Sequence, residues 1–215
     1  MVPLYHGPLI EIRLEPSGQE YTISRDLLCT ESPVFSAMFK SEFRESQEQT
    51  VTLQEEAGII STQGVEALIQ WLYLRVINFD IDDNSNHISA AIELARLADK
   101  YGIIIEIESY LAEDIKRVIC TAPWEKNYWL TTQHLVSGTL LPRDHPVRRT
   151  LAAACVQGYL EGKTHKFAQE AAEQPNFGAD LLREVRLVLS APNGPVGQIS
   201  FRDPIDNKPI YLGKD

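Results

Sequence analysis

Residues 21–39, YTISRDLLCTESPVFSAMF, decide the fold. The stretch begins with Tyr21-Thr22-Ile23, which has the alternation of a half-buried strand. Ser24 follows as an expected helix N-cap, because its hydroxyl can accept a hydrogen bond from an unpaired amide of the first turn. Ser32-Pro33 repeats the signal, since proline at the first helical position loses no hydrogen bond. The stretch therefore predicts a strand followed by two short helices.

An alternating segment precedes this stretch. Ile10, Ile12 and Leu14 alternate with charged residues, which is the period of a strand with one buried face. Residues 16–19, PSGQ, have turn chemistry, so a β-hairpin is expected over residues 10–23. A further short strand is expected over residues 50–53, where Val51 and Leu53 face one way.

The clearest helix signal lies in residues 65–73. Its apolar residues recur at helical spacing and form one stripe. They are Val65, Leu68, Ile69, Leu72 and Tyr73. Residues 76–81 then alternate again and predict a short strand.

Residues 87–101 predict a long central helix with Asn86 as its N-cap. Two apolar stripes run along it, so we expect it to be buried on two sides. They consist of Ile88, Ala91, Ile92, Ala95 and Ala98, and of Leu94, Leu97 and Tyr101. Gly102 is the expected stop, and residues 107–119 predict another amphipathic helix.

The pattern changes at Ala122-Pro123. Helices are expected over residues 131–140, 146–160, 166–173 and 178–189, and a short terminal hairpin over residues 198–212. In the second of these helices, Arg148 and Arg149 are expected on the outside, in a salt-bridged surface. The order of elements predicts an α+β domain over residues 8–120, an all-α extension over residues 121–197 and a tail over residues 198–215.

The composition argues for a globular protein that does not bind nucleic acid. The 215 residues are 44% hydrophobic and 23% charged, near the averages for soluble domains. The net charge is −10, whereas phosphate binding needs a basic surface. We expect no signal peptide and no membrane span, and therefore a location in the cytoplasm or nucleus.

No known chemical motif is present. Cys29, Cys120 and Cys155 are far apart and lie on apolar helix faces, where buried inert thiols are expected. None of the histidines has a partner at metal-ligand spacing, and each is expected in ordinary surface or cap use. These histidines are His6, His87, His134, His145 and His165. We therefore expect no catalytic, cofactor-binding or metal-binding residue.

Several segments together resemble the BTB/POZ family. Residues 21–28 and 32–39 resemble its "buried strand, leucine helix, S-x-x-F-x-x-M/L-F" block. Residues 67–73, ALIQWLY, resemble its helix that ends in tyrosine, and residues 91–101 resemble its "A-x-x-L-A-x-x-Y" helix. With its helical extension, the whole chain is similar to BTB proteins of filamentous fungi. The resemblance implies the BTB/POZ fold, a small sheet covered by a helical cluster.

The resemblance also implies a function. A BTB/POZ protein would be a non-enzymatic adaptor that forms a homodimer and recruits a cullin-type ubiquitin-ligase scaffold, with the extension holding a substrate. The residues expected to serve either the core or the contact with another chain are mostly core residues. They are Ile10, Leu27, Leu28, Val34, Phe35 and Met38.

Two departures leave alternatives open. Many family members have an aspartate at the start of the first strand and a histidine leading the first helix, near the dimer interface. Pro8-Leu9 and Ser24-Arg25 stand at these places. A second hypothesis is therefore a monomeric module that pairs with a different protein. A third makes the helical tail an enzyme that uses His134, His145 or His165 with nearby carboxylates.

Overall fold

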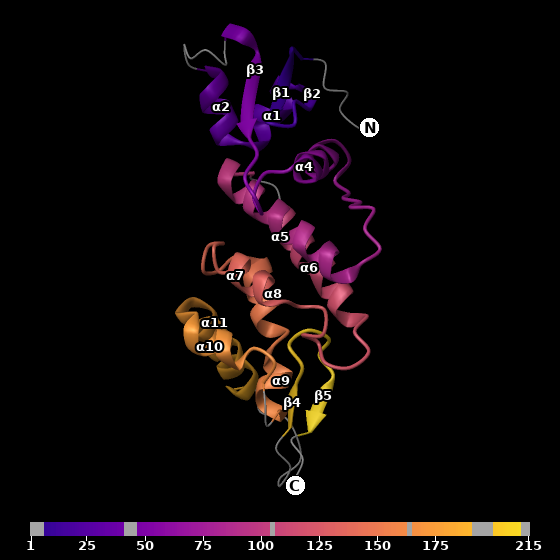
Figure 1. Ribbon diagram of the computed structural model, residues 1–215, viewed down its shortest axis with the longest axis vertical. Helices are drawn as coiled ribbons and strands as arrows, with labels where there is room; N and C mark the ends of the chain where they lie inside the picture. Colours follow the sequence, from indigo (N-terminus) through magenta and orange to yellow (C-terminus); the bar gives the residue numbers. More distant parts are fainter. Residues whose placement is uncertain (1–6, 41–46, 104–105, 163–164, 191–199, 212–215) are drawn as a thin grey trace. The chain divides into compact units, whose positions relative to one another are not determined.

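The computed structural model describes residues 7–40, 47–103, 106–162, 165–190 and 200–211. The chain divides into two compact units, each built from two stretches of sequence (Figure 1). The first unit comprises Met1–Ile81 and Ser89–Glu108, and the second comprises Asp82–Ile88 and Ser109–Asp215. The units are defined by proximity in space, so the domain boundary that the sequence predicts between residues 120 and 121 stays a prediction.

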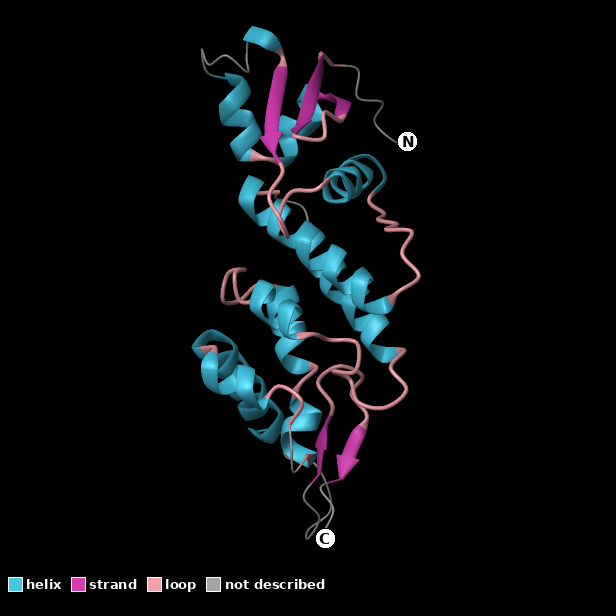
Figure 2. Ribbon diagram, in the orientation of Figure 1, coloured by secondary structure: helices cyan, strands magenta, loops and turns pink. Residues whose placement is uncertain are grey.

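The first unit contains a three-stranded sheet (Figure 2). Strands β1 (Leu9–Glu15) and β2 (Glu20–Ser24) form the expected antiparallel hairpin. Strand β3 (Thr50–Gln54) pairs with β1 in parallel, which gives the order β2-β1-β3. Because side chains alternate along a strand, one face of this sheet is apolar and buried. That face carries Ile10, Ile12, Leu14, Ile23, Val51 and Leu53.

Two capping serines begin the helices that follow β2. Helix α1 (Arg25–Glu31) begins after Ser24, whose Oγ accepts a hydrogen bond from the Leu27 amide at 3.3 Å. Helix α2 (Pro33–Lys40) begins after Ser32, whose Oγ accepts from the Phe35 amide at 3.1 Å. Both capping predictions are confirmed.

Helix α4 (Thr62–Leu74) is present, and Val65, Leu68 and Leu72 of its predicted stripe are buried, but the buried side is shifted around the helix. Ala67 and Trp71 are buried, whereas Ile69 is half-buried and Tyr73 is exposed. The strand predicted over residues 76–81 is wrong: the structure describes all six residues and assigns them to no strand. Their backbone is held instead by side chains of α4, and a positive φ of 51° at Asp80 breaks the extended path.

Helix α5 (Asn84–Tyr101) begins two residues before the expected cap. Asp83, not Asn86, takes the cap position, because its Oδ1 accepts from the Asn86 amide at 2.7 Å. Both predicted stripes are buried, which confirms a helix covered on two sides. Gly102 ends the helix at a φ of 60°, a conformation that favours glycine.

Helix α6 (Ile107–Cys120) also follows its prediction, with Ile107, Leu111, Ile115 and Ile119 buried. The expectation of three buried thiols is wrong. Cys155 is buried, but Cys29 is half-buried and Cys120, at the end of α6, is exposed.

The second unit is mainly helical. It contains α7 (Thr132–Gly138), α8 (Pro146–Ala153), α9 (Val156–Glu161), α10 (Ala168–Glu173) and α11 (Pro175–Ser190). The single helix predicted over residues 146–160 is therefore two helices, with a break at Ala154 and Cys155. Strands β4 (Ser200–Arg202) and β5 (Pro209–Tyr211) pair antiparallel and confirm the terminal hairpin. The α+β class and the helical C-terminal region are thus as expected.

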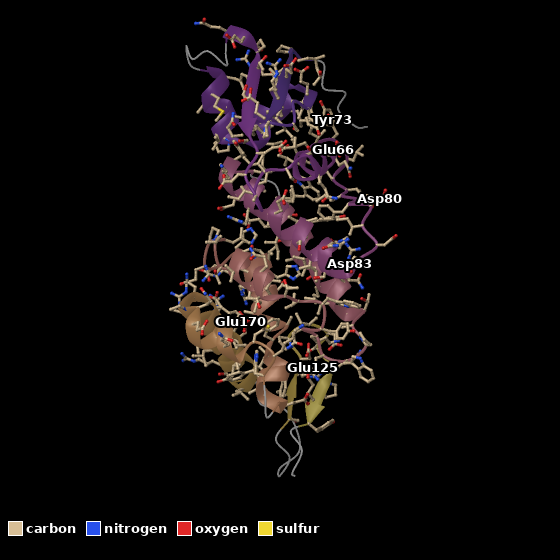
Figure 3. All side chains as sticks on the ribbon, in the orientation of Figure 1. Glu66, Tyr73, Asp80, Asp83, Glu125 and Glu170 are labelled. Carbon is tan, nitrogen blue, oxygen red and sulfur yellow. The ribbon has the colours of Figure 1, made fainter. Side chains whose placement is uncertain are left out.

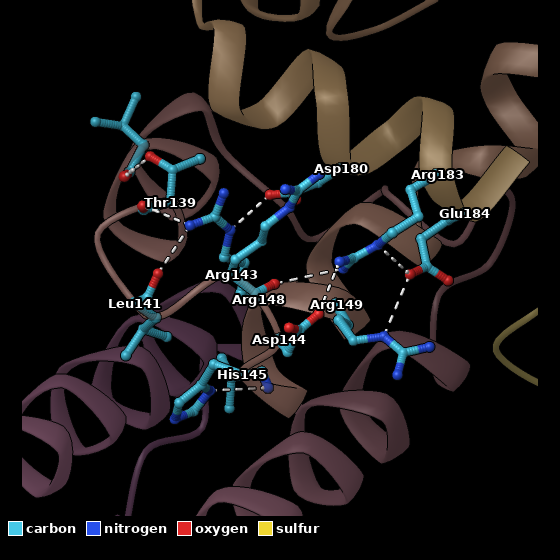
Figure 4. A network of polar contacts seen from close by, with 12 residues as sticks. Thr139, Leu141, Arg143, Asp144, His145, Arg148, Arg149, Asp180, Arg183 and Glu184 are labelled. Atoms are coloured by element: carbon cyan, nitrogen blue, oxygen red, sulfur yellow. Dashed lines mark hydrogen bonds and ion pairs between the residues drawn. The ribbon is translucent and has the colours of Figure 1, made fainter.

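The outward position predicted for Arg148 is wrong. Its side chain is 9% exposed, and its Nε lies 2.6 Å from Oδ2 of Asp180 on α11. Its Nη1 donates to the carbonyls of Thr139, at 3.0 Å, and Leu141, at 2.8 Å (Figure 4). A guanidinium has five donors, so one side chain can join α8, α11 and the end of α7. Arg149 does lie outside, 3.3 Å from Glu184.

Candidate protein-interaction surface

The six residues assigned to the core or to a protein contact divide into two groups. Four are buried in their own chain, each at most 2% exposed. They are Ile10, Leu27, Leu28 and Phe35. Val34 and Met38, on α2, are half-buried. This split agrees with the expectation that most are core residues, and a contact of any of them with another chain stays a prediction.

Val34 and Met38 belong to an outward apolar face of α2. Pro33 and Ala37 on the same helix are exposed. Because residues three and four apart lie on one side of a helix, Val34, Ala37 and Met38 are neighbours. We call Pro33, Val34, Ala37 and Met38 the α2 face. It is formed by aliphatic side chains and a thioether, which suits contact with another protein more than contact with water.

The α2 face is held firmly from behind. The Phe35 ring stacks on the Tyr101 ring with centroids 4.7 Å apart and planes at 8°. The Ser32 hydroxyl donates to the Tyr101 carbonyl while it caps α2. Burial raises the pKa of Tyr101, as expected of a phenol packed against the core. The face is thus attached to the end of α5.

Arg25 supports the other end of α2. Its guanidinium donates to the Phe39 carbonyl and lies 5.7 Å from the centre of the Phe39 ring. A cation over an aromatic face is a favourable contact. Arg25 therefore fixes the last turn of α2 to α1.

A second exposed apolar group follows the end of α4. Tyr73, Leu74 and Val76 are 37%, 68% and 55% exposed. We call these three residues the α4 exit; Figure 3 labels Tyr73. The Tyr73 hydroxyl accepts from the Ser24 amide at 2.9 Å, so this ring spans the edge of β2 instead of entering the core.

Arg75 explains why the α4 exit is exposed. It adopts a left-handed φ of 56° as the C-cap of α4. Its guanidinium lies 2.7 Å from the buried carboxylate of Glu31 and 5.8 Å from the centre of the Trp71 ring. With Arg75 anchored inward, its neighbours in sequence point outward. This turn could not be predicted from the sequence, because the C-cap is arginine and not glycine.

A polar crevice borders α4 on another side. It has a volume of about 330 Å³ and lies between α4 and residues 78–80. Glu66, labelled with Asp80 in Figure 3, accepts from the Tyr21 hydroxyl at 3.1 Å. Burial, together with this carboxylate, raises the pKa of Tyr21 to about 12. The crevice presents carboxylates, amides and the hydroxyl of Thr62.

A family model for the BTB/POZ domain matches residues 6–114, just over half of the chain. The chain belongs to the BTB/POZ family. Human Kelch-like protein 34 is 29% identical over 85 residues, which cover 40% of this chain and 13% of that protein. The chain thus matches a small part of its relative. BTB/POZ domains are in general non-enzymatic and mediate protein–protein interaction, so this BTB/POZ chain is an interaction protein.

The histidines of the helical region contribute to its backbone structure. Nδ1 of His134 accepts from the Thr131 amide, and Nδ1 of His145 accepts from the Val147 amide. Nδ1 of His165 accepts from the Phe167 amide at 2.7 Å. The expected cap use is confirmed for His134 and His145. No group of three or more potential metal ligands occurs within the described ranges.

Two other histidine expectations have different outcomes. His87 is half-buried and not on the surface: its Nε2 lies 2.6 Å from Oδ2 of Asp114, and its side chain is 21% exposed. His6 lies outside the described residues. In the part of the chain that the structure describes, no helix is both long and apolar enough to cross a membrane.

Proposed function

We propose that this protein is an adaptor whose BTB/POZ domain, residues 8–120, forms a homodimer. One observation carries the proposal: a BTB/POZ domain presents an apolar α2 face that is held rigidly by Tyr101 and Arg25. In a twofold homodimer the same patch meets itself, so an uncharged apolar face is well suited to the contact. Val34 and Met38 would make it, with Ile10, Leu27, Leu28 and Phe35 supporting it from the core.

A second part of the proposal concerns larger assemblies. The similarity to a Kelch-like protein supports recruitment to a cullin-type ubiquitin-ligase scaffold. Residues 124–215, which comprise most of the helical extension and the tail, would then hold the substrate, and the protein would act in the cytoplasm or nucleus. A pull-down with a cullin scaffold tests this part, and retention by the wild-type protein is the expected result. A monomeric variant distinguishes direct binding from binding that needs the dimer.

Light scattering over a dilution series tests the homodimer. We expect a dimer for the wild-type protein and a monomer for Met38→Glu. Each copy would bring a carboxylate into the apolar contact, and loss of a buried methionine alone costs roughly 1.5–3 kcal/mol. Dissociation should therefore become more than about 100-fold easier.

The matched control is Ala57→Glu, which adds the same charge at an exposed turn of the first unit. It should remain dimeric. A wild-type chain that is monomeric at all concentrations would refute self-association and favour the alternative of a module that pairs with a different protein. A dimeric Met38→Glu with an intact fold would place the interface elsewhere.

A further inference from the structure

A cavity of about 590 Å³ lies in the second unit, whereas the surfaces described above belong to the first. Its lining combines aromatic rings with carboxylates. The rings are those of Tyr128, Trp129 and Phe167, and the carboxylates are those of Asp83 and Glu170, both labelled in Figure 3. We call it the Tyr128 pocket. From this combination we infer that the Tyr128 pocket binds a methylated ammonium cation.

The aromatic part of the pocket is a corner of two rings. Tyr128 and Trp129 have centroids 4.6 Å apart and planes at 88°. Tyr128 is 45% exposed beside the cavity. The face of an aromatic ring carries negative charge density, and each cation–ring contact contributes roughly 0.5–2 kcal/mol. Such a corner suits an organic cation better than it suits water.

The charge of the lining has the complementary sign. Asp83 and Glu170 are negative and Lys166 is positive, so the lining carries two negative charges against one positive. Both carboxylates are held in place: Asp83 accepts from the Asn86 amide, and Glu170 accepts from the Thr132 hydroxyl. A bound cation would therefore meet carboxylates that are already oriented.

Lys166 belongs to the wall of the pocket. Its Nζ donates to the carbonyls of Asn127 and Tyr128, both at 3.0 Å, and of Leu130, at 2.8 Å. It also lies 5.1 Å from the centre of the Phe167 ring. These contacts use all three donors of the ammonium and hold residues 127–130 in place.

The same contacts decide which ammonium fits. A bare ammonium has three donors that must exchange water for protein acceptors. The carbonyls of residues 127, 128 and 130 already accept from Lys166, and one oxygen of Glu170 accepts from Thr132. A trimethylated ammonium has no donor to satisfy and keeps its charge. It gains from the rings and carboxylates without leaving donors unpaired, so methylation is the expected selectivity.

Nuclear magnetic resonance of the full chain tests the inference. The three tryptophans give three indole N–H signals, and Trp129→Phe identifies that of Trp129. Titration with tetramethylammonium chloride, against matched sodium chloride, should shift the Trp129 signal with a Kd of about 1–10 mM. The Trp124 signal serves as an internal reference, since Trp124 does not line this pocket.

Two five-residue alanine peptides carry either trimethyl-lysine or lysine at the centre. They test whether the pocket selects the methylated ammonium, and whether its ligand is a protein side chain or a free cation. The methylated peptide should bind at least about fivefold more tightly than the unmethylated one. Binding at least tenfold tighter than that of tetramethylammonium would indicate a methylated protein side chain as the ligand. Equal affinities of the methylated peptide and of tetramethylammonium would indicate a small free cation as the ligand.

Variants connect the binding to the pocket. Tyr128→Leu keeps an apolar side chain but removes the ring face, and about fivefold weaker binding is expected. Asp83→Asn should weaken it by a similar factor without changing the shape. Tyr211→Leu, at another exposed tyrosine of the second unit, is the matched control and should bind as wild type. An unshifted Trp129 signal, equal binding of both peptides or wild-type affinity in Tyr128→Leu would each overturn the inference.

Discussion

Replacing Asp180 by alanine removes the carboxylate that faces the Arg148 guanidinium inside the second unit. The two side chains are 3% and 9% exposed, and the Nε–Oδ2 distance is 2.6 Å. Arginine stays charged even when buried, so the variant leaves a positive charge without this counter-charge. Figure 4 shows how Arg148 lies between α8, α11 and the carbonyls of Thr139 and Leu141.

The expected loss of unfolding free energy depends on the contacts that Arg148 keeps in the Asp180→Ala variant. Removing one partner of a buried ion pair costs about 3–5 kcal/mol. Nη1 of Arg148 keeps the Thr139 and Leu141 carbonyls, so one part of the guanidinium remains satisfied. We therefore expect a loss near the lower end, about 3 kcal/mol of unfolding free energy.

Two comparisons show whether burial causes the effect. Arg149→Ala breaks the contact with Glu184 from a side chain that is 49% exposed, and it should cost about 1 kcal/mol or less. The double variant Arg148→Met and Asp180→Leu removes both charges and keeps apolar volume. It should recover more than half of the loss seen in Asp180→Ala, because no unpaired charge remains.

Urea unfolding followed by tryptophan fluorescence measures these differences. Trp124 and Trp129 belong to the second unit and Trp71 to the first, so all variants are compared in a Trp71→Phe background. A loss below about 1 kcal/mol for Asp180→Ala, equal to that of Arg149→Ala, would refute the reasoning. It would mean that water hydrates the Arg148 guanidinium in place of the Asp180 carboxylate.

Three further predictions concern the second unit. Burial lowers the pKa of His134 from 6.5 to about 4, so the unfolded chain binds the extra proton first. The free energy of unfolding should be highest above pH 6.5 and fall by at most about 3 kcal/mol towards pH 4, measured by urea unfolding at several pH values. The variant His134→Gln can keep the capping box and should lack this fall. Gly178→Ala should lower the melting temperature, because its Cβ would lie 2.5 Å from the Ala171 carbonyl oxygen, although helix propensity alone predicts a gain of about 1 kcal/mol. Lys166→Met leaves three carbonyls without their ammonium and should accelerate amide hydrogen exchange in residues 127–130, measured by mass spectrometry; unchanged exchange would contradict the role assigned to Lys166.

The order of elements could be predicted because local signals agree with the fold along most of the chain. Ser24 and Ser32 stand before the helices that they cap, and Gly102 ends the helix that precedes it. These signals depend on residues close in sequence, so no knowledge of tertiary neighbours is needed. The strand expected over residues 76–81 failed because Gln63 and Gln70 of α4 bind its backbone, which is a tertiary contact.

Polar residues of the second unit were predicted less well. Arg148 follows Pro146 in an amphipathic helix, and the usual expectation places a charged residue on the outside. Its partner, Asp180, is 32 residues away in sequence, and two further partners are backbone carbonyls. Backbone carbonyls have no sequence signature. The Tyr128 pocket was missed for the same reason, because its lining comes from residues 83–85, 128–132 and 166–170.

At the α2 face, helical periodicity alone does not distinguish the buried apolar residues from the half-buried ones. Val34, Phe35, Met38 and Phe39 form a single apolar side by spacing alone. At about 100° per residue, Met38, Phe35 and Phe39 lie about 40°, 100° and 140° around the helix from Val34. The structure buries the two phenylalanines and leaves the other two residues half-buried.

The rotation of α2 about its own axis produces this division, and Ser32 and Tyr101 set the rotation through the cap and the ring stack. Helix α4 shows a similar division, because Tyr73, the last residue of its predicted stripe, lies outside the core. Where an apolar stripe is wider than the core contact, some apolar residues at its edge stay outside the core. We call these residues the margin of the stripe, and a second protein can contact them. In this BTB/POZ chain, the α2 face and the α4 exit contain those margins. A partner contact should therefore be sought at the edges of the core stripes, where sequence periodicity and burial disagree.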